Sequence, residues 1–315
     1  MQNDATLAPP PRYLMCPPRH FAVTYSINPW MDPKAWADSG GTLAATASRQ
    51  WAALKRALAS AGARIETVEP APGLPDLVFT ANAAVVLDGK ALLARFRHPE
   101  RSGEQPVFAA AFQALARRGL IGEVSEMPQG IALEGAGDCI YDRHRTLFWM
   151  GCGFRSDPAA AAMVERTFGV ECVPLTLADP SFYHLDTAFC ALPCGGVIYF
   201  PDAFTADALA AIHARVAPED RISLDRADAA RFAANAVCFG GTVVLSSCTD
   251  DLRRALEGRG YVVVKTPLHA FLHSGGSACC LTLRLDHGAA AAPVPLAQEF
   301  RSERNFPQHR FQSKA

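Results

Sequence analysis

The chain has 315 residues, of which 50% are hydrophobic and 19% charged, so it can bury a sizeable core. Its formal net charge is -1, and it has no basic stripe that would bind nucleic acid or an anionic membrane. The N-terminus shows no positive segment followed by an apolar core, and no apolar run approaches the ~18 residues of a membrane span. We therefore expect a cytoplasmic protein without nucleic-acid or membrane partners.

Ten cysteines are scattered along the chain rather than clustered in a small framework. No CxxC pair is followed by another at zinc-ligand spacing, so the sequence predicts neither a metal site nor a cofactor. Most of the cysteines are expected to be reduced and buried. One of them can still be a nucleophile.

Four segments share one pattern, in which a short acid or amide precedes an apolar strand, a turn and a second apolar strand. They begin at Asn82, Asp138, Asp186 and Asn235, and each has turn-forming residues in its middle. A fifth candidate, GGSACCLTLRL, begins at Gly275. Any one of the four marker residues alone would be taken as a turn cap. Because four such residues occur at the same position of the pattern, a polar cavity that they share is about as plausible as four separate turn caps.

A predicted helix and a further strand follow each hairpin. The five helices are expected over residues 42–61, 104–119, 158–168, 205–216 and 249–258. The tight hairpins argue against a purely parallel sheet, and the spacing of roughly fifty residues is typical of propellers. We therefore predict an α/β fold of five hairpin-helix-strand units closed into a ring, in which the N-terminal strand RYLMCPP helps to complete the last unit.

The domain boundary is predicted near the C-terminus. Residues 1–287 would form the catalytic domain, and residues 288–315 a linker and tail. The stretch Ala289–Ala297 is rich in Ala and Pro, as linkers are. It leads to a basic tail, Arg301–Lys314, which is either mobile or docks on a neighbour.

Three segments are polar where a strand core should be apolar. EGAGD contains Glu134 and Asp138, FYHLDT contains His184 and Asp186, and GGSACC contains two adjacent cysteines. A cysteine, a histidine and a carboxylate are the minimum set for thiolate chemistry, and they need only be close in space.

The ordered motifs FTANA, RFRHPER, EGAGD, GFRSD, FYHLDT and GGSACC resemble the guanidino-group-modifying, or pentein, superfamily. The opening MCPPRHFAVTYSINPWM is similar to the bacterial dimethylarginine dimethylaminohydrolase branch and to cyanobacterial arginine dihydrolase domains. The resemblance runs from about Tyr13 to Leu285. It implies a fivefold pseudosymmetric α/β propeller, a small guanidino substrate and no cofactor.

The resemblance also implies residue roles. Cys280 would be the nucleophile, with Cys279 as the fallback, because neighbours on a strand face opposite sides. His184 would be the general acid and base, and Glu134 would hold the guanidinium. Asp186 would accept guanidinium N–H groups in the same way, whereas Asp138 would either do so or support its loop.

Further substrate contacts follow from the same resemblance. Arg101 and Arg155 would bind the substrate α-carboxylate through paired hydrogen bonds. Asn82 stands where deiminases and many dimethylarginine hydrolases place a second guanidinium-binding Asp, and it would face the substrate as an uncharged amide. Close relatives often have Lys-Ala where this chain has His273-Ser274, so His273 is either a cationic neighbour of the thiol or an inert loop residue.

The leading hypothesis is a hydrolase that converts dimethylarginine or arginine to citrulline and an amine or ammonia, through a Cys280 S-amidino intermediate. Its variants are an arginine dihydrolase that releases ornithine, carbon dioxide and ammonia, and an amidinotransferase. Two other classes are a non-enzymatic binding module on the same fold and a metal or redox protein that uses Cys279 and Cys280. A homo-oligomer is a further possibility.

Overall fold

The computed structural model describes residues 9–288. Within them, short strands pair into five separate three-stranded sheets, whose strand orders are β15-β1-β2, β3-β4-β5, β6-β7-β8, β9-β10-β11 and β12-β13-β14. In every sheet the central strand pairs antiparallel with one neighbour and parallel with the other. The structure is therefore a repeat of small mixed sheets, as the alternation of hairpins and helices predicts.

The strands are three to six residues long except for the last, which has two. They are β1 Arg12–Met15, β2 Arg64–Thr67, β3 Ala84–Leu87, β4 Lys90–Leu93, β5 Glu123–Glu126, β6 Cys139–Asp142, β7 Leu147–Cys152, β8 Glu171–Thr176, β9 Phe189–Ala191, β10 Val197–Tyr199, β11 Arg221–Ser223, β12 Val237–Phe239, β13 Thr242–Leu245, β14 Val262–Lys265 and β15 Leu283–Arg284.

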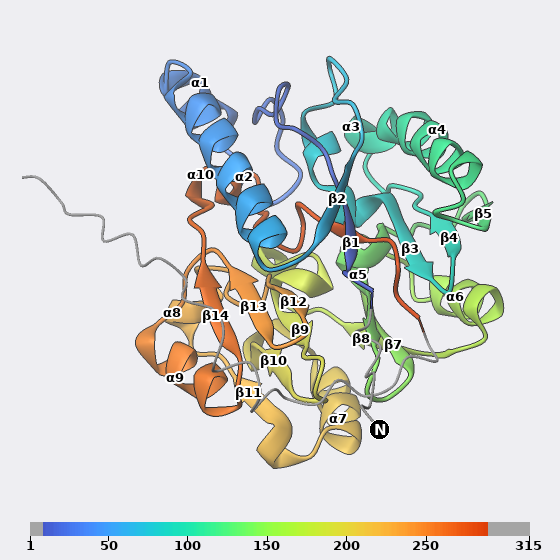
Figure 1. The fold of residues 1–315 in the computed structure, drawn as a ribbon, viewed down its shortest axis with the longest axis vertical. Helices are drawn as coiled ribbons and strands as arrows, with labels where there is room; N and C mark the ends of the chain where they lie inside the picture. The colour runs from blue at the N-terminus through green and yellow to red at the C-terminus, as the bar shows by residue number, and fades with distance from the viewer. Residues whose placement is uncertain (1–8, 289–315) are drawn as a thin grey trace, which may run out of the picture.

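The parallel partners in each sheet are connected by a crossover that contains a longer helix. These helices are α2 Thr42–Ser60, α4 Glu104–Arg117, α6 Ala160–Phe168, α7 Ala206–Arg215 and α9 Asp250–Gly258. They lie around the outside of the molecule, with the strands toward its middle (Figure 1). The predicted helices at these positions are confirmed, with boundaries that differ by up to two residues.

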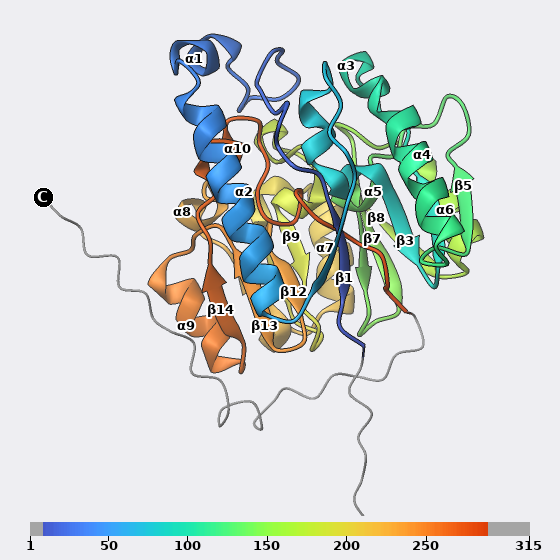
Figure 2. The ribbon, with the colours of Figure 1, turned by 45° about the horizontal axis from the view of Figure 1, so that its top comes forward.

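Short helical turns fill most of the remaining connections. They are α1 Pro33–Asp38, α3 Pro99–Ser102, α5 Gly135–Asp138, α8 Arg226–Ala229 and α10 His269–Leu272, with 3-10 turns at η1 Pro75–Val78, η2 Thr80–Ala83, η3 Pro180–Phe182, η4 Leu185–Thr187, η5 Pro201–Ala203 and η6 Pro218–Asp220. Figure 2 shows α1 and α3 at one end of the molecule, above the strands. No helix among residues 9–288 is long and apolar enough to cross a membrane.

Local chemistry accounts for the ends of these elements. Thr205 and Thr249 cap α7 and α9, where their side chains accept hydrogen bonds from the N–H groups of Ala208 and Leu252. The β3–β4 hairpin turns through Asp88-Gly89, both at positive φ (50° and 72°). A two-residue hairpin loop favours this backbone geometry.

The marker residues Asn82, Asp138 and Asp186 precede their strands, as predicted, and lie in short helical turns. The prediction for the segment from Gly275 is wrong, because only Leu283–Arg284 is a strand. The residues before it form turns instead, because the N–H groups of Leu281 and Thr282 donate to carbonyls four and three residues back.

The N-terminal strand completes the fifth sheet, as predicted. β1 pairs antiparallel with β15 and parallel with β2, so the first and last described strands are neighbours. The predicted boundary between residues 287 and 288 is not tested. The predicted linker Ala289–Ala297 and tail Arg301–Lys314 lie outside the described residues.

The core is built by packing the inner faces of the outer helices against the strands. Phe108, Phe112 and Leu115 of α4 are buried in one such cluster with strands β3 and β4. Phe112 has no exposed surface. The helices thus fix the strand positions, and the strand positions fix the loops that precede them.

Replacing Phe112 by Ala should lower the free energy of unfolding by about 3–5 kcal/mol, because a fully buried ring is exchanged for a cavity. Chemical denaturation of the purified protein measures this change. Its exposed neighbour Gln113 provides the matched control, and Gln113→Ala should stay within about 0.5 kcal/mol of the parent. Equal effects of the two substitutions would contradict this description of the α4 core.

Candidate active site

Cys280 lies in the loop immediately before β15, where turn hydrogen bonds and Asn235 fix the backbone. Its N–H donates to Asn235 Oδ1 at 3.1 Å, and Asn235 Nδ2 donates to the Cys280 sulfur at 3.0 Å. The same Nδ2 also donates to the carbonyl oxygen of Asp186 at 3.1 Å. One amide side chain therefore holds the thiol against the loop that precedes β9.

The Cys280 thiol donates to Asp186 Oδ2 at 3.1 Å. The other carboxylate oxygen of Asp186 is buried and has no hydrogen-bond partner among the described residues. Burial raises the pKa of Asp186 to about 7, despite hydrogen bonds from Cys280 and Asn235 that lower it. Burial, followed by the nearby Asp186 carboxylate, also raises the pKa of the Cys280 thiol well above its usual value.

A second buried group is built on Glu134, which precedes α5. Its Oε2 contacts His184 Nε2 at 2.8 Å and accepts a hydrogen bond from Arg155 Nη1 at 3.0 Å. Its Oε1 accepts the backbone N–H of Arg97 at 3.2 Å. Burial alone would raise the pKa of Glu134, but Arg155 and His184 outweigh it and hold the pKa well below its usual range. Glu134 is therefore a stable carboxylate that orients the histidine ring.

Arg101 forms the third part of the site. Its Nε and Nη2 donate to the two oxygens of Glu104, both at 2.8 Å, and its Nη1 donates to Asn82 Oδ1 at 2.9 Å. A further bond reaches the carbonyl oxygen of Asp76 at 3.3 Å. Asn82 in turn donates through Nδ2 to the carbonyl oxygen of Glu134 at 3.2 Å. Arg101 thus fixes the side-chain amide of Asn82.

Asp138 supports the loops rather than the pocket. It accepts the backbone N–H of Leu185 at 2.9 Å and the Ser156 hydroxyl at 2.7 Å. It does not line the pocket that contains Cys280 and His184. Of the two roles expected for Asp138, the geometry favours the structural one, because its hydrogen bonds position the residue that follows His184.

The glycines of EGAGD allow these loops to approach one another closely. Gly135 has φ of +62°, and a Cβ there would lie 2.6 Å from the carbonyl oxygen of Ala81. A Cβ on Gly137 would collide with the side-chain amide of Asn82. Both positions require glycine because the Glu134 loop packs directly on the Asn82 loop.

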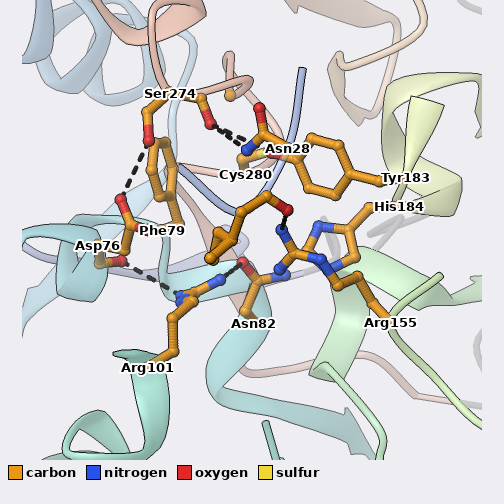
Figure 3. A pocket seen from close by; sticks show the side chains of 12 residues that line it. Asn28, Asp76, Phe79, Asn82, Arg101, Arg155, Tyr183, His184, Ser274 and Cys280 are labelled. Carbon is orange, nitrogen blue, oxygen red and sulfur yellow. Dashed lines mark hydrogen bonds between the residues drawn. The ribbon is translucent and has the colours of Figure 1, made fainter. Parts of the chain in front are cut away.

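Cys280, His184, Asn82, Arg101 and Arg155 line one small pocket, with an empty volume of about 260 Å³. Figure 3 shows the Arg101–Asn82 hydrogen bond on one side of it and Arg155 on another. The Arg155 guanidinium also stacks over the ring of Tyr183, 4.5 Å from its centroid. The structure thus brings together four of the predicted side chains with Cys280, while Glu134 and Asp186 do not line the pocket themselves but contact two residues that do, His184 and Cys280.

Some pocket residues were not foreseen from the sequence as part of the site. The lining also includes Asp76, Asn28, Tyr183, Ser274 and Phe79. Asp76 accepts hydrogen bonds from the Ser274 hydroxyl at 3.1 Å and from the Tyr25 hydroxyl at 2.8 Å. The signal for Asp76 was present, since a lone acid interrupts the apolar stretch LPDLVF. Phe79, Tyr183 and Asn28 lie within the motifs FTANA, FYHLDT and MCPPRHFAVTYSINPWM, and Ser274 directly precedes GGSACC, but these motifs gave no reason to assign the four residues to the site.

Cys279 and His273 lie outside this pocket. Cys279 faces a second cavity on the other side of the loop, so the two adjacent cysteines do point to different spaces, although they lie in a turn and not on a strand. His273 ends α10 and is exposed. The inert reading of His273 is therefore the one that the geometry favours. Within residues 9–288, no group of three or more His, Cys, Asp or Glu side chains is arranged to hold a metal.

The fold and the site together define an α/β protein in which a buried thiol, bonded to the Asp186 carboxylate, lines one pocket with a histidine that Glu134 holds. The chain matches the family model described as N,N dimethylarginine dimethylhydrolase, eukaryotic, over residues 18–286. It belongs to this family, within the guanidino-group-modifying superfamily, and the predicted resemblance is confirmed.

Two relatives show the extent of the sequence similarity. The bifunctional arginine dihydrolase/ornithine cyclodeaminase AgrE of Nostoc sp. is 42% identical over 274 residues, which cover 87% of this chain and 38% of AgrE. The chain thus corresponds to little more than a third of that relative. The N(G),N(G)-dimethylarginine dimethylaminohydrolase of Mycobacterium tuberculosis is 37% identical over 274 residues, covering 87% and 85% of the two chains.

A solved structure supports the same family assignment. The N-terminal domain of the cyanobacterial arginine dihydrolase ArgZ, crystallised with its substrate as a cysteine-to-serine variant, superposes with a TM-score of 0.81 at 39% identity. The match covers 89% of this chain and 99% of that domain.

The Asp186 carboxylate should control the reactivity of the Cys280 thiol. Since its charge raises the thiol pKa, Asp186→Asn should speed alkylation of Cys280 by iodoacetamide at pH 8 by ~10-fold or more. Peptide mass spectrometry, in a Cys279→Ala background, follows the reaction at this one thiol. Glu165→Gln, far from the thiol on α6, serves as the control and should leave the rate unchanged. Unaltered alkylation in Asp186→Asn would contradict the description of this pair.

Proposed function

We propose that this chain is a thiol-dependent hydrolase that attacks the guanidinium carbon of arginine or an N-methylated arginine through Cys280. The observation that carries the proposal is the unpartnered carboxylate oxygen of Asp186, buried beside the Cys280 thiol. A buried carboxylate oxygen without a donor is unfavourable. A planar guanidinium bound here would supply the missing N–H donor and place its carbon near the sulfur.

The reaction follows from the contacts of three side chains. The cationic substrate favours the ionised forms of Asp186 and Cys280, both of which burial disfavours in the free protein. The thiolate then attacks the guanidinium carbon, and His184, oriented by Glu134, protonates the departing nitrogen. His184 next takes a proton from water, and the water oxygen attacks the carbon of the S-amidino intermediate. The C–S bond then breaks, so Cys280 leaves as the thiolate and a ureido product is released.

The amino-acid end of the substrate would meet the other side of the pocket. Arg155 has two of its five N–H donors engaged, with Glu134 and with the carbonyl oxygen of Ile27, so it can bind a carboxylate. Arg101 has four of its five engaged, with Glu104, Asn82 and Asp76, so its main role is to position Asn82. Asp76 is the pocket carboxylate available to the substrate ammonium group.

A second candidate function is the dihydrolase reaction, in which the ureido product is hydrolysed further to ornithine, carbon dioxide and ammonia. Asn82 favours it, because the amide retains an N–H that can donate to a ureido oxygen, which a carboxylate cannot do. The relatives named as arginine dihydrolases are also more similar to this chain than the mycobacterial dimethylarginine hydrolase. Amidinotransfer, with an amine replacing water, remains a third prediction.

We further propose that the five sheets close into the fivefold α/β propeller that the repeat predicts. The pairing of β1 with both β15 and β2 supports such a ring. The predicted cytoplasmic location, the possible homo-oligomer and catalysis without a metal or cofactor stay predictions.

The decisive assay incubates the purified protein with arginine, dimethylarginine, monomethylarginine, agmatine and citrulline, and resolves citrulline, ornithine, ammonia and methylamines. Hydrolysis of at least one guanidino substrate is expected, and ornithine formed from arginine identifies the dihydrolase. Cys280→Ser should lower turnover by at least ~10³-fold, since the nucleophile is lost. Cys279→Ser is the matched control and should retain activity within a few fold. Near-normal turnover by Cys280→Ser would refute the assigned nucleophile.

The activity should also depend on the ionisation of Asp186. Because the pKa of this carboxyl group is raised to about 7, it is neutral at lower pH and loses its attraction for a guanidinium. We expect kcat/KM to fall by ~10-fold per pH unit below pH 7. Asp186→Asn should be slow at every pH and lack this dependence. A flat profile between pH 5.5 and 7.5 in the parent enzyme would contradict the role of Asp186.

A further inference from the structure

A second, larger cavity lies on the other side of the Cys279–Cys280 loop, where Cys279 and Thr282 line it. Its wall is mostly apolar and includes four thiols, those of Cys139, Cys190, Cys238 and Cys279. The proposed hydrolysis uses none of these groups. The four thiols in its wall therefore have no role in the reaction at Cys280.

Two of the four thiols are in direct contact. The sulfurs of Cys190 and Cys238 lie 3.5 Å apart, although the residues are 48 positions apart in the sequence. Cys190 is the middle residue of β9 and Cys238 the middle residue of β12, so the contact joins two different sheets. Both are free thiols, and Cys238 is the more exposed of the two. A disulfide requires a sulfur separation of about 2.05 Å, so the two sulfurs would have to approach each other further.

The positions of these cysteines link them to the nucleophile. Cys190 follows Asp186 by four residues, and Cys238 follows Asn235 by three. Asp186 and Asn235 are the two side chains that contact the Cys280 sulfur. The Asn235 side-chain amide also donates a hydrogen bond to the backbone carbonyl oxygen of Asp186. A bond between β9 and β12 would therefore act on both contacts of the reactive thiol.

We propose that Cys190 and Cys238 form a redox modification site, in which a small hydroperoxide that enters the second cavity converts the two thiols to a disulfide and lowers the activity at Cys280. The disulfide itself does not depend on the proposed function, whereas its effect on turnover does. Reduction by a dithiol reverses the change.

The chemistry balances in two steps. The Cys238 thiolate attacks the outer oxygen of the peroxide, which leaves a sulfenic acid and releases hydroxide or alkoxide that takes up a proton. The Cys190 thiol then attacks the Cys238 sulfur, and water leaves. In total, two thiols lose two protons and two electrons, and one peroxide is reduced. Cys238 is the more exposed of the two thiols, so it suits the first step, and the buried Cys190 sulfur, 3.5 Å away, is placed for the second.

Peptide mapping tests the disulfide without any activity assay. The full chain, in a Cys280→Ala background, is treated with one equivalent of hydrogen peroxide, alkylated and digested without reduction. We expect one cross-linked product, between the peptides of Cys190 and Cys238, that disappears on treatment with dithiothreitol. Cys248→Ala, a buried cysteine outside this cavity, should preserve the cross-link, and Cys238→Ala should abolish it. Oxidation that instead links Cys139 to Cys172 or Cys279, or gives only sulfinic acids, would overturn the proposal.

A second measurement tests the effect on the site. The chain with Cys280 intact and its Cys238→Ala variant are oxidised in parallel, and turnover is compared before and after dithiothreitol. We expect turnover of the parent to fall at least fivefold, in proportion to the cross-linked fraction, and to recover on reduction, while Cys238→Ala changes by less than twofold. If oxidation lowers turnover equally in both proteins, the loss comes from oxidation of Cys280 itself. The proposed effect of the Cys190–Cys238 disulfide on activity would then be rejected. A mapped cross-link with no loss of turnover would reject it as well.

Discussion

The structure of the site depends on one constraint, which is that charges removed from water must be paired. Glu134 meets this constraint within the protein, because Arg155 and His184 contact the same carboxylate oxygen. Asp186 does not, since one of its oxygens has no partner among the described residues. The two carboxylates therefore differ in role, because Glu134 is paired within the protein and Asp186 has an oxygen without a partner. Glu134 is fixed and orients the histidine, whereas Asp186 has an oxygen that, in the proposed reaction, accepts a hydrogen bond from the cationic substrate.

The repeated architecture explains how such a site can be assembled from distant segments. Asn82 lies just before β3, Glu134 before α5 and β6, Asp186 before β9, Asn235 before β12 and Cys280 before β15. Each of the five sheets thus contributes the loop that precedes its antiparallel outer strand. Because the helices packed on the outside hold these strands, the loops are fixed at both ends. Close approach then needs residues without side chains, such as Gly135 and Gly137.

The same arrangement places a second set of groups on the far side of the loops. The strands that follow Asp186 and Asn235 present Cys190 and Cys238 to each other, at the wall of the second cavity. Cys279 and Cys280 divide in the same way, one toward each space. A change in the distance between β9 and β12 would therefore reach the pocket through two short, hydrogen-bonded loops.

The sequence by itself determined the elements, because apolar alternation, turn pairs such as Asp88-Gly89 and threonine caps are local properties. It also determined the chemical types at the site, through Cys280, His184, Glu134 and Asp186 in their motifs. Only the tertiary structure decided which carboxylate is paired and which is free, that Asp138 supports a loop, that Arg101 holds Asn82, and that Cys190 meets Cys238. These are contacts between residues far apart in the chain. Their distances depend on how the sheets and helices pack, and no local pattern encodes them.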